Sequence, residues 1–302
     1  MANAKEIKRR IGSIKNTAQI TKAMELISTV KMKKAQDSAN SKKLFVSEAM
    51  KVFYRIESGL SDFSLFKEGQ WDKTLGVVIT SNKWLCWGYN INVMKKINSY
   101  INETWETVDF VWIWKRWANF VAKTGNNLIA DFSDDFSDNI TASFSKNITS
   151  LIVEKFMSGE YKKVVVFYNH YVNTMTQLPV ARKFLEISKE DIVSYFKQVL
   201  WKEDFDALEN DLKWEELNFE FEPSEEELAE EIIPFILDMM LFDIILSSKA
   251  SEHSARMIAM KSAKDNANKY AWKLTLQYNK ARQAAITTEI SEICAGAEAM
   301  KD

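Results

Sequence analysis

The chain has 302 residues, of which 46% are hydrophobic and 27% charged, so it can bury a core and is not a disordered tail. With 40 Lys and Arg against 42 Asp and Glu, its net charge is only -2, which argues against a nucleic-acid-binding protein. The only cysteines are Cys86 and Cys294 and the only histidines are His170 and His253. These numbers exclude a disulfide framework and a His-rich metal centre.

The sequence gives no sign of a signal peptide or a membrane span. It opens with Met-Ala-Asn-Ala and passes directly into a charged helical pattern. The most apolar stretch, Ile232 to Leu246, is shorter than a membrane span and contains Pro234, Asp238 and Asp243. We therefore expect no membrane-spanning segment.

Near the N-terminus, apolar or small residues recur at steps of three and four, which predicts a helix with a narrow packing seam. The seam consists of Ile7, Ile11, Ile14, Ala18 and Thr21, with a neighbouring row at Ile20, Met24 and Ile27. One uninterrupted helix over residues 1–58 would be on the order of 80 Å long at 1.5 Å per residue. Such a helix is too long for a globule.

Between residues 70 and 200, strand-like and helical runs alternate, which predicts a central Rossmann-like α/β domain. The strand-like runs are Thr74–Thr80, Val108–Ile113, Asn127–Phe132 and Lys163–Tyr168, and the helical runs are Ile91–Thr104, Arg116–Lys123 and Ile140–Met157. No glycine-rich phosphate-binding motif follows the first strand, and no Ser-His-Asp grouping can be defended with two histidines. We expect a scaffold with no catalytic, cofactor-binding or metal site.

The C-terminal third predicts an acidic connector and a second long helix. Residues 202–231 carry two lysines against fourteen acidic residues, so residues 201–223 are expected to form a solvated connector. Ser224 begins a capping-box pattern that starts a helix over residues 224–302, broken or kinked near Pro234. Its seam consists of Met260, Ala263, Ala267, Tyr270, Leu274, Tyr278, Ala281 and Ala285. The fold expected is therefore α/β with a long helical extension, an antiparallel coiled coil of the two terminal helices.

Several long strings resemble those of one known family. The N-terminal helix reads KEIKRRIGSIKNTAQITKAMELISTVKMKKAQ, and the last helix contains SEHSARM and KARQAAIT. Both closely resemble the signature ends of the gamma subunits of bacterial F-type ATP synthases. The internal strings VITSNKWLCWGYN, FYNHYVNTMTQLPV and FEFEPSEEEL are similar to that family's landmarks in the same order. The resemblance covers essentially the whole chain.

The resemblance implies a non-catalytic rotor. In that family the paired terminal helices form the central shaft inside a ring of three alpha and three beta subunits, and the α/β domain lies on the epsilon subunit and the membrane ring of c subunits. Rotation of the c-ring, driven by protons, is thereby coupled to ATP synthesis or hydrolysis on the beta subunits. The expected location is peripheral, on the cytoplasmic face of a bacterial membrane. Two alternatives are a structural coiled-coil adaptor with an α/β head and a nucleotide-binding α/β enzyme.

The resemblance also assigns contact or coupling roles to five residues: Met24, Arg256, Arg282, Gln283 and Thr287. Met24 matches a methionine near the level where the shaft meets the beta subunits, and Arg256 matches the segment that faces it. Arg282 and Gln283 match an Arg-Gln pair that contacts a loop of one beta subunit, and Thr287 lies one turn beyond. The alternative for each residue is an ordinary packing or surface role.

Tryptophan stands where that family has glycine. Trp84 and Trp87 lie in the segment that family members write GLCGGYN, and Trp114 and Trp117 replace glycines around two basic residues. Glycine occurs 8 times here, and adding the 10 tryptophans would bring it to about 6%, close to the usual value of about 7%. We hypothesise that the gene decodes UGA as glycine; the alternative is genuine tryptophan at all ten positions. Peptide mass spectrometry that finds tryptophan at positions 84 and 87 of the native protein would exclude the hypothesis.

Overall fold

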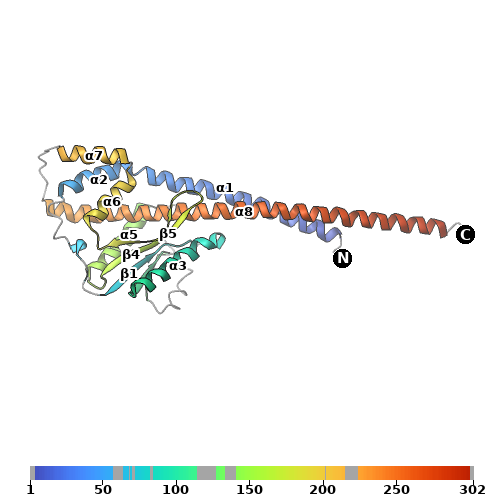
Figure 1. Ribbon diagram of the computed structural model, residues 1–302, viewed down its shortest axis with the longest axis horizontal. Coiled ribbons are helices and arrows are strands. Elements are labelled where there is room, and N and C mark those ends of the chain that lie inside the picture. Colours follow the sequence, from blue (N-terminus) through green and yellow to red (C-terminus); the bar gives the residue numbers. More distant parts are fainter. Residues whose placement is uncertain are drawn as a thin grey trace. The chain divides into compact units, whose positions relative to one another are not determined.

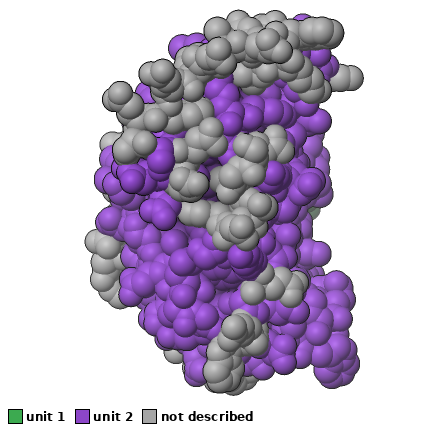
Figure 2. Space-filling view, turned by 90° about the vertical axis from the view of Figure 1, so that its left-hand side faces the viewer, with its two compact units in different colours: residues 1–30, 256–302 green, residues 31–255 purple. Residues whose placement is uncertain are grey.

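The computed structural model of the protein (Figure 1) describes residues 4–56, 64–67, 69, 72–81, 84–113, 127–132, 141–200, 202–214 and 224–299. The chain forms two compact units: unit 1 comprises residues 1–30 and 256–302, and unit 2 comprises residues 31–255. Figure 2 shows one face of unit 2. Two helices, α1 (Ala4–Asn40) and α8 (Glu225–Ala299), contribute residues to both units.

Unit 1 is an antiparallel pair of helices, the first part of α1 and the last part of α8 (Figure 1). Its buried apolar side chains are Ile7 and Ala18 from α1 and Met260, Ala271 and Leu274 from α8. The two helices are also joined by an ion pair, in which Lys264 Nζ lies 2.7 Å from Glu25 Oε2. The predicted pairing of the terminal helices is thus confirmed.

The seam of α8 is displaced from the prediction at one step. Tyr270 is 55% exposed, and the buried residue is its neighbour Ala271. The spacing from Ala267 to Leu274 allows either residue, because it divides into steps of three and four through Tyr270 or of four and three through Ala271. Only the small alanine lets the backbones of the two helices approach closely. Ala285 is also exposed, as are Ile20 and Ile27 of the row next to the seam on α1.

Unit 2 contains a five-stranded sheet with the order β3-β2-β1-β4-β5. The first four strands are parallel: β1 (Lys73–Val78), β2 (Thr107–Trp112), β3 (Leu128–Asp131) and β4 (Lys163–Tyr171). All four predicted strands are confirmed. A fifth strand that was not predicted, β5 (Gln177–Leu185), pairs antiparallel with β4. It is an edge strand, which explains why it tolerates Pro179.

Unit 2 also contains the helices α2 (Lys43–Ile56), α3 (Trp87–Thr104), α5 (Ala142–Met157), α6 (Lys189–Val199) and α7 (Lys202–Trp214), with short 3-10 turns η2 (Ser64–Phe66) and η3 (Trp84–Cys86). Two of the predicted helical runs correspond to α3 and α5. The third, Arg116–Lys123, lies outside the described residues. Strands β1, β2 and β4 are buried almost throughout, as in parallel sheets covered on both faces.

Two predictions of chain continuity are wrong. The single helix expected over residues 1–58 is interrupted by a turn at Ser41 and Lys42. The reason is tertiary, because Lys42 pairs with Asp243 of α8 and α2 then buries Met50 and Phe53 in the core. The acidic connector likewise contains α7, whose Phe205 is buried.

Helix α8 begins as predicted and is then continuous for 75 residues. The backbone N–H of Glu227 donates to Ser224 Oγ at 3.2 Å, which is the N-cap contact. The helix continues through Pro234 without a break. None of the described helices is both long and apolar enough to span a bilayer. Cys86 is buried and Cys294 is exposed, and no disulfide joins them.

Trp105 ends α3 in a left-handed backbone conformation. Its φ is 56° and ψ 19°, its N–H donates to the carbonyl of Ile101, and its side chain is 90% exposed. Glycine usually occupies this position because it has no β-carbon. Trp112, in contrast, is buried and donates its indole N–H to Thr80 Oγ1 at 3.2 Å. Of the four positions singled out above, Trp114 and Trp117 lie outside the described residues.

Trp105→Gly is expected to raise the free energy of unfolding by about 1 kcal/mol. A β-carbon in the left-handed region costs roughly 1–2 kcal/mol, and the greater freedom of glycine in the unfolded chain offsets part of the gain. Urea denaturation of the purified chain measures the change. The control is Trp272→Gly, which places glycine within α8 at another exposed tryptophan and is expected to lower stability slightly. A loss of stability in both variants would contradict the left-handed assignment.

Candidate functional site

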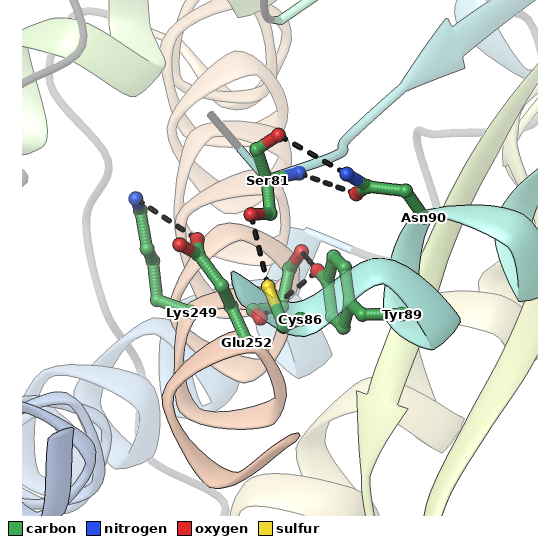
Figure 3. A network of polar contacts seen from close by, with 7 residues as sticks. Ser81, Cys86, Tyr89, Asn90, Lys249 and Glu252 are labelled. Atoms are coloured by element: carbon green, nitrogen blue, oxygen red, sulfur yellow. Dashed lines mark hydrogen bonds and ion pairs between the residues drawn. The ribbon is translucent and has the colours of Figure 1, made fainter. Parts of the chain in front are cut away.

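The carboxyl edge of the sheet is the part of this fold at which a ligand site is expected. In doubly wound folds, ligands bind where the strand order reverses, here between β1 and β4. After β1, the backbone N–H of Ser81 donates to Asn90 Oδ1 at 2.8 Å, and Asn90 Nδ2 donates back to the Ser81 carbonyl at 3.3 Å (Figure 3). Ser81 Oγ also lies 3.2 Å from Cys86 Sγ. These contacts fix the loop to the first turn of α3.

Helix α8 fills the crevice beside this loop. Tyr89 Oη donates to the carbonyl of Ser248 at 3.0 Å and lies 2.5 Å from its hydroxyl. On the other side, the N–H of Tyr171 at the end of β4 donates to Ser247 Oγ at 3.0 Å. Both walls of the crevice therefore contact the helix. The space that a nucleotide occupies in related folds is taken, which argues against the nucleotide-binding enzyme.

A buried ion pair lies on the same stretch of α8. Lys249 Nζ and Glu252 Oε2 are 3.3 Å apart, and both side chains are almost fully buried (Figure 3). Burial makes such a pair costly to break, because either charge alone would be left in a low dielectric. No group of His, Cys, Asp and Glu able to hold a metal ion occurs in the described part of the chain.

The five residues predicted to make contacts fall into two groups. Arg282, Gln283 and Thr287 lie on one exposed segment of α8, residues 282–297, in which every side chain is exposed. Thr287 Oγ1 donates back to the Gln283 carbonyl at 3.0 Å, so its hydroxyl is engaged within the helix. Met24 is half-buried in unit 1, whereas Arg256 is almost fully buried.

Sequence reasoning missed an apolar stripe on this exposed segment. Ile286, Ile290 and Ile293 follow one another at steps of four and three and are all exposed. These isoleucines have the same spacing as the residues of the two seams. No described helix, however, packs against this end of α8. Aligned exposed isoleucines of this kind mark an interaction surface.

Comparison with known proteins gives consistent matches over the whole chain. The sequence model of the ATP synthase family matches residues 3–300. The ATP synthase gamma chain of Methylacidiphilum infernorum is 36% identical over 307 residues, covering 99% of this chain and 100% of the relative. The gamma chain of Flavobacterium psychrophilum is 35% identical over 305 residues and covers 100% of both chains.

Solved structures with the same fold come from mitochondrial ATP synthases. A chain in the OSCP/F1/c-ring structure from Euglena gracilis has a TM-score of 0.59 and 18% identity, covering 98% of this chain and 94% of that one. A chain in the central stalk/c-ring structure from Tetrahymena thermophila has a TM-score of 0.55 and 19% identity, covering 81% and 99%. At these identities the likeness establishes the fold.

Tyr89→Phe is expected to lower the free energy of unfolding by about 1 kcal/mol, because the buried hydroxyl of Ser248 and its carbonyl lose their partner. Thermal melting followed by circular dichroism measures the change. Tyr270→Phe, at an exposed position, is the control and is expected to leave the melting temperature unchanged. Equal melting temperatures for Tyr89→Phe and the wild type would show that α8 does not depend on this contact.

Proposed function

The chain belongs to the ATP synthase gamma chain family, and from this premise we propose that it is the central-stalk rotor of a proton-translocating F-type ATP synthase. A gamma chain is a subunit of this membrane-associated complex and is not its catalytic subunit. The proposed partners are the alpha and beta subunits, the epsilon subunit and the c-ring, on the cytoplasmic face of a bacterial membrane. The Euglena structure is of OSCP, F1 and the c-ring, and the Tetrahymena structure is of the central stalk and the c-ring.

One observation carries this proposal above all: α8 extends beyond its packed seam as the fully exposed segment 282–297. Exposing three aligned isoleucine side chains to water is unfavourable. We therefore propose that this segment lies inside the ring of alpha and beta subunits. A structural adaptor of the coiled-coil type would instead be expected to pair α8 along its length. The crevice of the sheet, filled by α8, supports a scaffold role for the α/β domain.

Coupling then follows from contacts that differ between rotary positions. A rotor changes the nucleotide affinity of a beta subunit only if its contact free energy differs between the states of that subunit. Arg282 and Gln283 are suited to such contacts, because both are exposed and neighbouring on the helix. The guanidinium offers five donors in a plane to a carboxylate, and the amide both donates and accepts. Thr287, one turn further, is proposed to extend the same contact surface.

Arg282→Leu combined with Gln283→Leu is expected to leave the alpha-beta-gamma complex assembled while steady-state ATP hydrolysis falls several-fold. A hydrogen bond to a charged group is worth roughly 1.5–3 kcal/mol, enough to alter a rotary step but too little to hold the assembly together. Gel filtration measures assembly, and a coupled ATPase assay measures turnover.

The control for this double variant is Lys273→Leu with Gln277→Leu, which removes a positive charge and an amide from other exposed positions of α8. It is expected to hydrolyse ATP at the wild-type rate. Wild-type turnover in the Arg282 and Gln283 variant would refute the contact assignment, and failure to assemble would make these residues structural.

Met24 and Arg256 are proposed to act at the level where the shaft meets the beta subunits. Met24→Lys is expected to lower the number of protons pumped per ATP hydrolysed more than it lowers stability, because a new charge near acidic partner groups would favour one rotary position. Proton pumping by membrane vesicles and ATP hydrolysis are measured together. Ala23→Lys, at the adjacent exposed position, is the control. Equal pumping per ATP in Met24→Lys and wild type would contradict the coupling role.

A further inference from the structure

A cavity of about 220 Å³ lies within unit 2, away from the exposed segment of α8. It is open to one side and is lined by the end of α1, strands β4 and β5, helix α6 and the middle of α8. Its polar lining residues are Gln36, Asn40, Tyr168, His170, Tyr171, Arg182, Tyr195, Gln198, Asp243 and Ser247. The charge and the hydrogen-bonding groups of this lining determine which class of ligand the cavity can bind.

The register of β4 and β5 brings three of these side chains to one face of the sheet. Tyr168 and His170 are two residues apart on β4, so their side chains point to the same side. Arg182 of β5 is opposite Val166, which places its side chain on that side as well. The rings of Tyr168 and His170 are 6.2 Å apart at an interplanar angle of 84°. The three polar groups therefore converge on the cavity.

The cavity carries a positive charge that no described carboxylate neutralises. Arg182 donates to the amide oxygen of Gln198 at 3.0 Å, and it makes no ion pair with any described residue. The one carboxylate in the lining, Asp243, is already engaged, since Lys42 pairs with it and Tyr195 Oη donates to it at 2.6 Å. The guanidinium of Arg182 is thus the uncompensated charge.

The neighbouring groups of Arg182 are oriented as donors. Because Ser247 Oγ accepts the N–H of Tyr171, its own hydrogen can be donated to His170 Nδ1, which lies 3.2 Å away. The proton of the neutral imidazole then lies on Nε2. Burial, together with the nearby Arg182, lowers the pKa of His170, which keeps the ring neutral at pH 7. Burial raises the pKa of Tyr168, so its hydroxyl keeps the hydrogen that it can donate to an acceptor.

We propose that this cavity binds a small oxyanion, a phosphate or a carboxylate, through Arg182, His170 and Tyr168. A phosphate or carboxylate is an acceptor that matches a planar guanidinium flanked by two further donors. At about 220 Å³, the cavity is smaller than the roughly 300–1,000 Å³ of sites for drug-sized ligands. It therefore suits a small anion rather than a nucleotide. This site is independent of the proposed rotary role.

Isothermal titration calorimetry of the full chain with sodium phosphate, and separately with sodium malonate, tests the proposal at an ionic strength held constant with sodium chloride. Saturable one-site binding of at least one anion is expected. Arg182→Gln is expected to weaken it roughly tenfold or more, since it removes the charge. Lys183→Gln removes the same charge from the next residue of β5, whose side chain pairs instead with Glu186 and Asp191, and is expected to bind within twofold of wild type.

The two anions distinguish the source of the ligand. Tighter binding of phosphate identifies a phosphate site, and tighter binding of malonate identifies a carboxylate site. The absence of saturable binding of both anions, or equal affinity in Arg182→Gln and wild type, would overturn the proposal. If circular dichroism shows that Arg182→Gln is unfolded, His170→Leu decides: it is expected to weaken binding several-fold, and unchanged affinity would overturn the site.

Discussion

The packing of α8 against the carboxyl edge of the sheet is the constraint on which unit 2 depends. Serines at positions 247, 248, 251 and 254 are almost fully or partly buried and small enough for the helix to approach β4 and α3 closely. Two of their hydroxyls also form hydrogen bonds to neighbouring elements. Ser254 Oγ donates to the carbonyl of Thr174 at 2.5 Å, and Ser247 Oγ accepts the backbone N–H of Tyr171. The edge that a cofactor occupies in other doubly wound proteins is here used to hold a helix.

The two units of the chain are packed in different ways. Unit 2 has an extensive apolar core that includes Phe110, Phe167 and Phe196. Unit 1 instead buries single side chains spaced along its seam, and Lys264 and Glu25 join its two helices by an ion pair that is only partly buried. Ion pairs of this kind contribute little, on the order of 1 kcal/mol or less. The rigidity of the helices in unit 1 therefore comes mostly from backbone hydrogen bonds within each helix.

Periodicity in the sequence was sufficient to predict the four parallel strands and both terminal helices, because their apolar patterns are strong and local. It could not locate the turn at Ser41, which depends on Lys42 meeting Asp243 some 200 residues later in the chain. Strand β5 was missed because an edge strand is half exposed and contains Pro179. The oxyanion cavity was also invisible, since only strand register brings Arg182 beside Tyr168.

The candidate contact residues show a different limit. The predicted seam runs through Ala281 and Ala285, which leaves Arg282 and Gln283 beside the packed row, and both residues are exposed. The contacts themselves depend on a partner surface that lies outside this chain. The left-handed backbone at Trp105 was equally hidden, because nothing in the pattern of α3 marks where a helix ends on a residue other than glycine.

The distribution of the two thiols has a practical consequence. Cys294 is exposed near the end of α8, whereas Cys86 is buried beside Ser81 in the sheet unit. A maleimide dye should therefore modify the folded chain at a single position without any engineered cysteine. Attached before assembly, a fluorophore at Cys294 would report the orientation of this helix by polarised emission, from a point within the exposed segment that also holds Arg282, Gln283 and Thr287.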